Sequence, residues 1–235
     1  MKNKDFGAYR EYARECSDKV VGFIPARGGS KEIKDKNLIM LAGYPLVAHA
    51  ILTLKVAGVN DVYVSTDSKK IADVSKIYGA KVIMRPSEIS GDSASAEQAI
   101  KHFITKVQCD VIAMRQCTSP LLEPSHISHA INRLLVDCLD SIFTVTNTKS
   151  CDMLLWNSQI KPVNYNPKNR SGRQRRSRYL YIETGGLYVF RVSSFLRNNC
   201  RISDRNLEVQ EVPFAQSFEI DNEKDFGLIK KILEK

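Results

Sequence analysis

The chain has 235 residues, of which 43% are hydrophobic and 26% are charged, and its formal net charge at pH 7 is +9. A chain of this length can bury one sizeable core, which predicts one domain over residues 1–235, with a short extension over residues 1–19. No apolar run reaches the roughly 20 residues that a membrane-spanning helix needs. The first residues are charged throughout, so we expect neither a signal peptide nor a membrane partner.

The six cysteines are scattered and lack the CxxC spacing of zinc sites and redox motifs. This pattern predicts reduced thiols in a cytoplasmic protein. The cysteines are Cys16, Cys109, Cys117, Cys138, Cys151 and Cys200. The positive net charge suits an anionic partner, which could be a nucleic acid, a membrane surface or a phosphorylated small molecule.

Apolar, strand-like runs alternate with helical stretches over the first two thirds of the chain. We expect strands at 20–25, 61–65, 81–84, 111–115 and 141–145, and helices at 46–57, 69–78, 94–106 and 124–136. Such alternation predicts a Rossmann-like α/β fold, with a mainly parallel sheet and helices on both faces. Ligands of these folds bind beyond the carboxyl ends of the strands. The loops after Pro25, Ser65, Met84 and Arg115 should therefore meet at one crevice.

The alternation stops in the second half of the chain. Residues 149–178 are largely polar and end in an arginine-rich run, RSGRQRRSR. The following YLYIETGGLYVF predicts a strand, a bend and a second strand. The chain closes with an expected strand at Phe218–Ile220 and a helix at Glu223–Leu233. We expect residues 151–188 to form a small lobe that contributes to dimerisation and to the substrate site.

A basic, glycine-containing loop follows the first expected strand in FIPARGGSKEIKDKN. Gly28 and Gly29 allow main-chain N–H groups to approach phosphate oxygens closely. Four cationic side chains surround them, namely Arg27, Lys31, Lys34 and Lys36. The loop matches neither GxxxxGK[ST] nor GxGxxG. It is nevertheless predicted to hold a triphosphate.

The string IPARGGSKxIKxKN resembles the N-terminal signature of the acylneuraminate cytidylyltransferase family, the CMP-sialic acid synthetases. Further blocks follow in the family's order and extend the resemblance over roughly residues 20–235. These blocks are LAGYPL at 41–46, VSTD at 64–67, RPSE at 85–88, DSAS at 92–95, QCTSPL at 116–121, ETGG at 183–186 and FEID at 218–221.

The resemblance implies a fold of the nucleotide-diphospho-sugar transferase type. It also implies transfer of CMP from CTP to an acidic nine-carbon sugar, with release of pyrophosphate. A homodimer is the assembly that it implies, with the lobe exchanged across a twofold axis so that Arg173 can complete the partner's site.

Roles in nucleotide binding follow from the same resemblance. Arg27 and Lys36 match residues that hold the CTP phosphates, and with Asp221 they are the expected catalytic residues. Arg85 is a candidate for contacting cytosine. The full set of expected nucleotide-binding residues is Ala26, Arg27, Gly28, Gly29, Ser30, Lys36, Asn37, Arg85, Asp92, Ser93 and Ser95.

Two carboxylates near the end of the chain, Glu219 and Asp221, are the expected ligands of Mg²⁺. Residues two apart on a strand point to the same face, so both could bind one hard cation through oxygen. The family usually shows Asp-x-Asp at this place, whereas this chain has Glu-x-Asp. The expected substrate-binding residues on the sugar side are Gln116, Thr118, Ser119, Arg173, Gln174, Glu183 and Thr184.

Several alternatives stay open at this point. The sugar could be legionaminate, pseudaminate, a deaminated nonulosonate or the eight-carbon acid Kdo in place of N-acetylneuraminate. A sugar-1-phosphate nucleotidyltransferase would share the early loop and the metal carboxylates. From a different class, the arginine run could mark a nucleic-acid-binding protein. No recognised nucleic-acid motif accompanies that run, and we expect no nucleic-acid partner.

Overall fold

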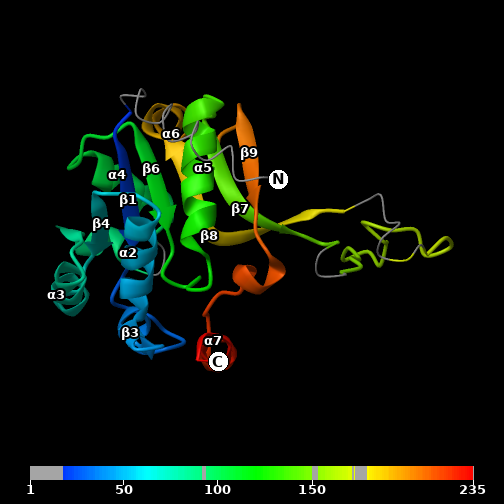
Figure 1. Ribbon diagram of the computed structural model, residues 1–235, viewed down its shortest axis with the longest axis horizontal. Helices are drawn as coiled ribbons and strands as arrows, with labels where there is room; N and C mark the ends of the chain where they lie inside the picture. Colours follow the sequence, from blue (N-terminus) through cyan, green and yellow to red (C-terminus); the bar gives the residue numbers. More distant parts are fainter. Residues whose placement is uncertain (1–17, 92–93, 150–152, 171, 173–178, 235) are drawn as a thin grey trace.

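One mixed β-sheet organises the chain in the computed structural model, which describes residues 18–91, 94–149, 153–170, 172 and 179–234. Within these residues the sheet has seven strands in the order β5-β4-β1-β6-β8-β7-β9 (Figure 1). The strands are β1 (Val20–Pro25), β4 (Val62–Thr66), β5 (Lys81–Met84), β6 (Val111–Arg115), β7 (Ser141–Asn147), β8 (Tyr181–Arg191) and β9 (Leu207–Glu211). A separate small hairpin joins β2 (Met40–Leu41) to β3 (Tyr44–Pro45).

Most neighbouring strands of the sheet run parallel, which confirms the predicted sheet type. Strand β1 pairs in parallel with both β4 and β6, and β4 pairs in parallel with β5. Strand β8 is antiparallel to both of its neighbours, β6 and β7, and β9 returns to parallel pairing with β7. The parallel half therefore delivers the loops after β1, β4, β5 and β6 to one edge of the sheet.

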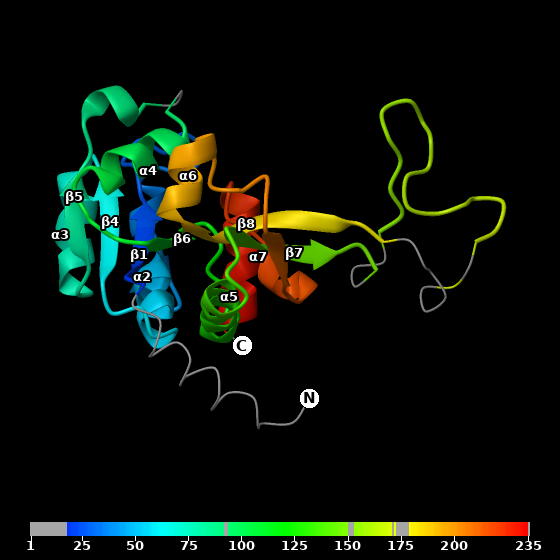
Figure 2. The same cartoon turned by 90° about the horizontal axis from the view of Figure 1, so that it is seen from above.

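Helices cover both faces of the sheet (Figure 2). They are α2 (Leu46–Val56), α3 (Lys69–Ile77), α4 (Ala96–Ile104), α5 (Pro124–Val136), α6 (Val192–Asn198) and α7 (Glu223–Leu233). Ser95 caps α4 and Asn222 caps α7, each through a reciprocal capping box. None of the helices in the described residues is long and apolar enough to span a bilayer.

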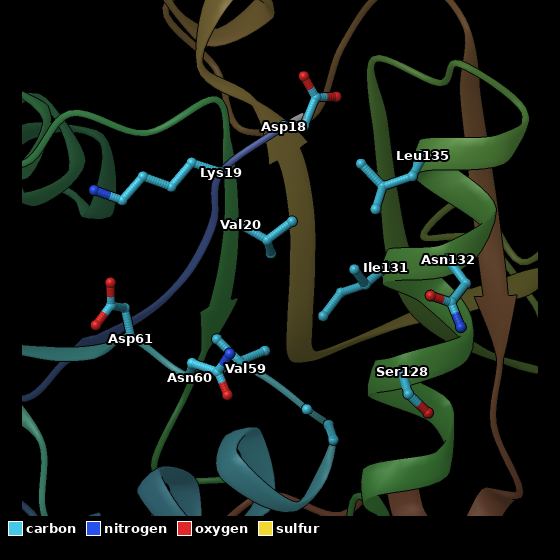
Figure 3. Close-up of a pocket in the computed structure, with 12 residues that line it drawn as sticks. Asp18, Lys19, Val20, Val59, Asn60, Asp61, Ser128, Ile131, Asn132 and Leu135 are labelled. Atoms are coloured by element: carbon cyan, nitrogen blue, oxygen red, sulfur yellow. The ribbon is translucent and has the colours of Figure 1, made fainter. Parts of the chain in front are cut away.

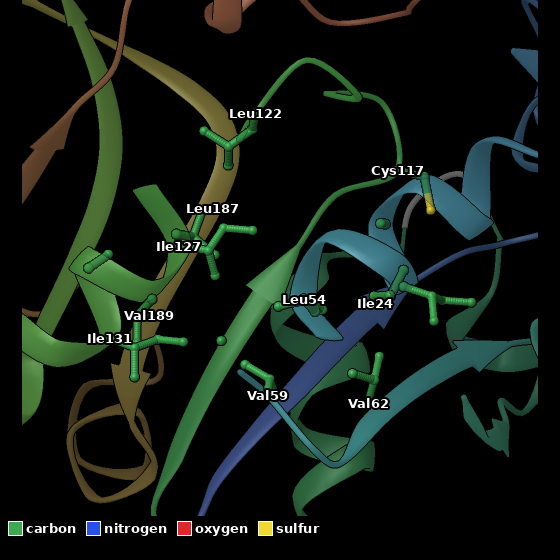
Figure 4. Close-up of a cluster of buried hydrophobic side chains, with 14 of the residues drawn as sticks. Ile24, Leu54, Val59, Val62, Cys117, Leu122, Ile127, Ile131, Leu187 and Val189 are labelled. Carbon is green, nitrogen blue, oxygen red and sulfur yellow. The ribbon is translucent and has the colours of Figure 1, made fainter. Parts of the chain in front are cut away.

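The hydrophobic core has two parts because side chains alternate between the faces of each strand. On one face, Ile24 and Val189 pack with Leu54 of α2 and Ile127 of α5 (Figure 4). On the other face, Phe23 packs against α4, with its ring centroid 4.7 Å from that of Phe103. The sheet is thus buried on both sides, as its apolar strands predict.

The structure corrects two expectations about the second half of the chain. The predicted strand at Phe218–Ile220 is wrong, because a 3₁₀ helix at Phe214–Ser217 leads directly into irregular chain. The predicted pair of strands around Gly185 is one continuous strand, β8. Gly185 has φ +65°, and the pairing register with β7 shifts between Phe143 and Val145, so the bend is accommodated within the strand.

Helix α6 and strand β9 were not predicted from the sequence. Residues 153–170, between β7 and β8, project away from the sheet in both views (Figures 1 and 2). Within this segment, the buried side chain of Asn164 binds the carbonyl oxygen of Met153 at 2.9 Å and the N–H of Leu155 at 2.8 Å. These contacts give the projecting segment its own local structure. The predicted division into one domain with a small lobe stays a prediction.

We expect two isoleucine variants, one in the core and one on the surface, to differ in how much they lower the free energy of unfolding. Ile51 on α2 is fully buried, whereas Ile77 on α3 is 79% exposed. Ile51→Ala should lower the free energy of unfolding by about 2–5 kcal/mol through lost contacts and a cavity. Ile77→Ala should change it by about 0.5 kcal/mol or less. Urea denaturation measures both, and equal losses would contradict this placement of the core.

Candidate active site

The basic loop after β1 is fixed by main-chain and side-chain contacts to its neighbours. The N–H of Ala26 donates to the Ser65 carbonyl oxygen at 2.9 Å, and the N–H of Gly28 donates to Asp67 Oδ1 at 2.9 Å. The buried Asn37 side chain donates from Nδ2 to the carbonyl oxygen of Arg27 at 2.9 Å. A Cβ at Gly28 would lie 2.9 Å from Ser68 Cβ, so this position needs glycine for steric reasons.

The side chain of Lys36 connects this loop to the end of the chain. Its Nζ donates to the carbonyl oxygen of Ile220 at 3.0 Å and lies 3.4 Å from Asp221 Oδ1. The N–H of Ile220 in turn donates to the carbonyl oxygen of Thr118 at 2.7 Å, in the loop after β6. Three segments that are distant in sequence therefore meet at the carboxyl ends of β1 and β6.

The two predicted metal carboxylates lie in this same region. Ser119 Oγ donates to Glu219 Oε1 at 3.1 Å, and a Cβ at Gly185 would overlap the Glu219 carboxylate. Burial raises the pKa of Glu219 above its ordinary value, while the Ser119 hydrogen bond opposes that rise. Asp221 is exposed. Because residues 218–221 do not form a strand, their shared position comes from irregular chain anchored at Ile220.

Arg85 contacts the end of β4 and is not among the residues that line the crevice. Its buried guanidinium donates from Nη2 to the Ser65 carbonyl oxygen at 2.8 Å, and its Nε has no hydrogen-bond partner among the described residues. Burial lowers the pKa of Arg85, with Asp67 opposing that change. The predicted contact between Arg85 and cytosine stays a prediction.

The residues predicted for the sugar side are separated by the structure. Gln116 and Thr118 line the crevice, and Ser119 contacts Glu219. The Glu183 carboxylate accepts a hydrogen bond from the Tyr188 hydroxyl, and the buried Thr184 hydroxyl donates to Thr144 Oγ1 at 2.8 Å. Both of these side chains have partners within the sheet, and neither lines the crevice.

Other predicted residues lie apart from the crevice or beyond the described chain. Ser95 is the N-cap of α4, and its Oγ accepts a hydrogen bond from the N–H of Gln98 at 3.2 Å. Gly29 is exposed at the tip of the loop. Asp92, Ser93, Arg173 and Gln174 lie outside the described residues.

A crevice of about 460 Å³ gathers these groups at the carboxyl edge of the sheet. Its lining combines cations from the loop after β1 with carboxylates from the end of the chain. The lining residues are Pro25, Arg27, Ser30, Lys31, Glu32, Lys36, Asn37, Gln116, Cys117, Thr118, Glu219 and Asp221. Burial raises the pKa of the Cys117 thiol to about 12, so at neutral pH it is protonated and a poor nucleophile.

The carboxylates of Glu219 and Asp221 fit a magnesium ion whose remaining ligands are phosphates of the substrate and waters. In the described part of the chain, no group of three or more His, Cys, Asp or Glu side chains could hold a metal by itself. Mg²⁺ is commonly held by one or two carboxylates together with substrate phosphates and waters. Glu219 and Asp221 supply such a pair beside the cationic loop.

A second cavity, of about 430 Å³, lies at the opposite end of the strands (Figure 3). It is bordered by the start of β1, the chain between α2 and β4, and one side of α5, including Val20, Asp61 and Asn132. Its acidic residues are already paired, because Asp61 binds Lys81 and Asp18 binds Arg191, each at 2.7 Å.

The family model described as cytidylyltransferase matches residues 21–234. This chain is a cytidylyltransferase family member. The match covers every element from β1 to α7, including both walls of the crevice.

Named relatives extend the comparison. This chain is 37% identical over 197 residues to N-acylneuraminate cytidylyltransferase A of Danio rerio, a match covering 80% of this chain and 45% of that protein. It is 29% identical over 238 residues to CMP-N,N'-diacetyllegionaminic acid synthase of Legionella pneumophila, covering 92% and 97% of the two chains. The chain thus spans about half the length of the Danio rerio relative and nearly all of the Legionella one.

Solved structures show the same fold. One is CMP:2-keto-3-deoxy-manno-octonic acid synthetase complexed with CTP, with a TM-score of 0.68 and 20% identity over 92% of this chain and 98% of that one. Another is 4-diphosphocytidyl-2C-methyl-D-erythritol synthase from Anaerococcus prevotii, with a TM-score of 0.65 and 13% identity over 93% of this chain and 99% of that one. The predicted nucleotide-diphospho-sugar transferase type of fold agrees with both.

The sequence pattern did not point to one charged residue beside the crevice. Arg115 ends the apolar strand β6 and is fully buried beside the crevice, where its guanidinium binds main-chain carbonyl groups. The available signal was an arginine at the end of VIAMR, where a buried strand meets a predicted ligand loop.

The two glycines of the loop after β1 should respond differently to an added methyl group. Gly28→Ala would press on Ser68 at the start of α3, and it should lower the free energy of unfolding by about 1–3 kcal/mol. At Gly29 a Cβ meets nothing within 4 Å, so Gly29→Ala should change it by about 0.5 kcal/mol or less. Denaturant titration of both variants is the measurement. Indistinguishable midpoints would argue against close contact between the loop and α3.

The raised pKa of Glu219 predicts a pH-dependent stability difference from Glu219→Gln. An unfolded glutamate has a pKa of about 4.3, and the folded pKa is higher, so the folded state binds the proton more tightly between the two values. The favourable contribution of the protonated side chain is complete below pH 4 and is lost as the pH rises through the folded pKa. Relative to Glu219→Gln, the metal-free wild-type protein should therefore lose stability on going from about pH 4 to pH 7. A constant difference across this range, measured by urea denaturation, would contradict the shift.

Proposed function

We propose that this cytidylyltransferase transfers CMP from CTP to the anomeric hydroxyl of a nonulosonic acid, with release of pyrophosphate. The observation that carries the proposal is the joining of Arg27 and Lys36 with Glu219 and Asp221 around one crevice. The sugar hydroxyl oxygen forms a bond to the α-phosphorus and loses its proton. The bond from that phosphorus to the oxygen bridging the α- and β-phosphates breaks, and pyrophosphate leaves.

The loop after β1 is suited to the polyphosphate. Arg27 offers a planar fork of donors, and Lys36 offers a compact charge held in place by Ile220. In-line phosphoryl chemistry depends mainly on positioning and charge neutralisation, which fixed cations provide. We assign Arg27 and Lys36 to this task, and Asp221 serves the same reaction as a ligand of the divalent ion.

The same proposal assigns Mg²⁺ to Glu219 and Asp221. When bound, the ion would offset repulsion between carboxylates and triphosphate and polarise the α-phosphate. Ser119 fixes the Glu219 side chain, and Lys36 lies beside Asp221.

The acceptor is proposed to enter from the side of Gln116 and Thr118. Their amide and hydroxyl groups border the crevice, and Thr118 Oγ1 is buried without a hydrogen-bond partner among the described residues. A buried hydroxyl of this kind is available to a polar ligand. The names of the relatives support an acid sugar of sialic or legionaminic type.

A homodimer is part of the proposal. The segment between β7 and β8 exposes large apolar side chains, with Trp156 50%, Val163 44% and Ile160 79% exposed. A second copy of the chain could cover them, since large apolar side chains clustered on a projecting segment favour association. Light scattering should give twice the chain mass, and a monomer with full activity would contradict the assembly.

The proposed compartment is the cytoplasm, which suits the free thiols of Cys109, Cys117 and Cys200.

Turnover with a panel of substrates tests the function. The protein should release pyrophosphate with CTP, Mg²⁺ and one of N-acetylneuraminate, legionaminate, pseudaminate, deaminated nonulosonate or Kdo. Arg27→Ala and Asp221→Asn should each lower kcat by about 100-fold or more, because the first removes a cation beside the phosphates and the second removes a ligand of the proposed Mg²⁺. Asp73→Asn, at an exposed carboxylate on α3, is the matched control and should leave kcat unchanged.

Two results would contradict the proposal. Absence of pyrophosphate with every acceptor would reject the reaction, and full turnover by Asp221→Asn would remove that residue from the site. Tight, steeply salt-dependent binding of RNA or DNA would favour the nucleic-acid alternative instead.

A further inference from the structure

Arg115 brings a positive charge into the interior of the protein. Its side chain is fully buried at the end of β6. Burial lowers the pKa of Arg115 to about 10, with Cys117 and Glu219 opposing that change, so the guanidinium remains charged at neutral pH. A buried charge is costly unless fixed dipoles or opposite charges compensate it. The groups that compensate this one are main-chain carbonyls, one of which belongs to the crevice residue Gln116.

The guanidinium binds three main-chain carbonyl oxygens from two segments. Nη1 donates to Gln116 O at 2.9 Å and to Gly186 O at 3.0 Å, and Nη2 donates to Ser119 O. The first and third of these oxygens belong to the loop after β6, and the second belongs to the middle of β8. Arg115 therefore fastens both ends of the loop at 116–119 to the neighbouring antiparallel strand.

This loop in turn holds the segment that carries the metal carboxylates. Ser119 Oγ donates to Glu219 Oε1 at 3.1 Å, and Thr118 O accepts the N–H of Ile220 at 2.7 Å. The neighbour of Gly186 in β8, Gly185, lies directly against the Glu219 carboxylate. Displacement of the loop would consequently move the acceptor side of the crevice and Glu219 together.

We propose that Arg115 is a positioning residue that sets the acceptor loop at 116–119 and the Glu219 carboxylate relative to the nucleotide. It touches no reactant in this assignment and acts through Ser119 and Thr118. The inference rests on the proposed function for its kinetic consequence, while its structural consequence is independent of the reaction.

The geometry requires arginine rather than another cation. A guanidinium presents five N–H donors in a planar fork, whereas an ammonium is a single compact centre that cannot reach carbonyls on two sides equally well. Lysine would keep the charge and lose part of the fastening. Methionine would keep much of the side-chain volume and lose both the positive charge and the hydrogen bonds to the carbonyls.

The test compares Arg115→Met and Arg115→Lys with Arg191→Met. Arg191 is a matched control at the other end of β8, where its Nε donates to Leu139 O at 3.0 Å and its Nη1 pairs with Asp18 at 2.7 Å. Three readouts are used: hydrogen exchange in peptides covering 116–122 and 217–222, CTP binding without metal by calorimetry, and steady-state kinetics with the acceptor that wild type uses best.

For Arg115→Met, we expect about tenfold faster exchange in both peptides, because loss of the fastening increases local opening. The kcat/KM for the acceptor should fall by about 100-fold, as misplacement of reacting groups by about 1 Å can produce. The Kd for metal-free CTP should stay within about threefold of wild type, since the cationic loop after β1 makes most of its contacts. Arg115→Lys should show intermediate losses, and Arg191→Met should change none of the three.

Unchanged hydrogen exchange and an unchanged kcat/KM for the acceptor in Arg115→Met would overturn the inference. Equal fold-losses in CTP affinity and in kcat/KM for the acceptor would overturn it as well. If Arg115→Met does not fold, Arg115→Lys decides by the same comparison with Arg191→Met. If wild type releases no pyrophosphate with any acceptor, the proposed function fails, and the exchange data alone decide whether Arg115 positions the two segments.

Discussion

One ammonium group links the first loop of the sheet to the last irregular segment of the described chain. Lys36 Nζ binds the carbonyl oxygen of Ile220, 184 positions away, at 3.0 Å, and lies 3.4 Å from the Asp221 carboxylate. The Asp221 side chain is 69% exposed, so the ion pair adds only about 0–1 kcal/mol to stability. The pair matters mainly for position, because it holds the cations of the loop after β1 and the carboxylates of Glu219 and Asp221 around one crevice.

The order of strands makes this link possible. Strands β1 and β6 are parallel neighbours, so their carboxyl ends deliver the cationic loop and the acceptor loop side by side. Strand β8 runs the other way beside β6, which brings the middle of that strand, at Gly185 and Gly186, beneath the acceptor loop. Strand β8 supplies none of the lining residues of the crevice, and its contacts are indirect, through Gly186 with Arg115 and Gly185 with Glu219.

Burial and charge act against each other at the centre of the site. Burial raises the pKa of Glu219 and lowers that of Arg115, which disfavours the charged form of each. Each group is also stabilised in its charged form by the other, although their direct partners are Ser119 and main-chain carbonyls. This attraction joins Glu219, which lines the crevice, to Arg115, which is fully buried beside it.

Local pattern in the sequence determined the alternating elements, the parallel character of the sheet and the loop after β1, because apolar periodicity and capping depend on near neighbours. The helix at Glu223–Leu233 was predicted with the bounds that the structure gives, since Asn222 and Asp225 cap it locally. Only the tertiary structure decided that β8 enters the sheet antiparallel, that Phe218–Ile220 forms no strand and that Arg115 binds main-chain carbonyls of the loop at 116–119. Each of these depends on contacts between distant segments, such as Thr118 with Ile220 and Arg115 with Gly186. The periodicity of apolar residues along the chain does not predict such contacts.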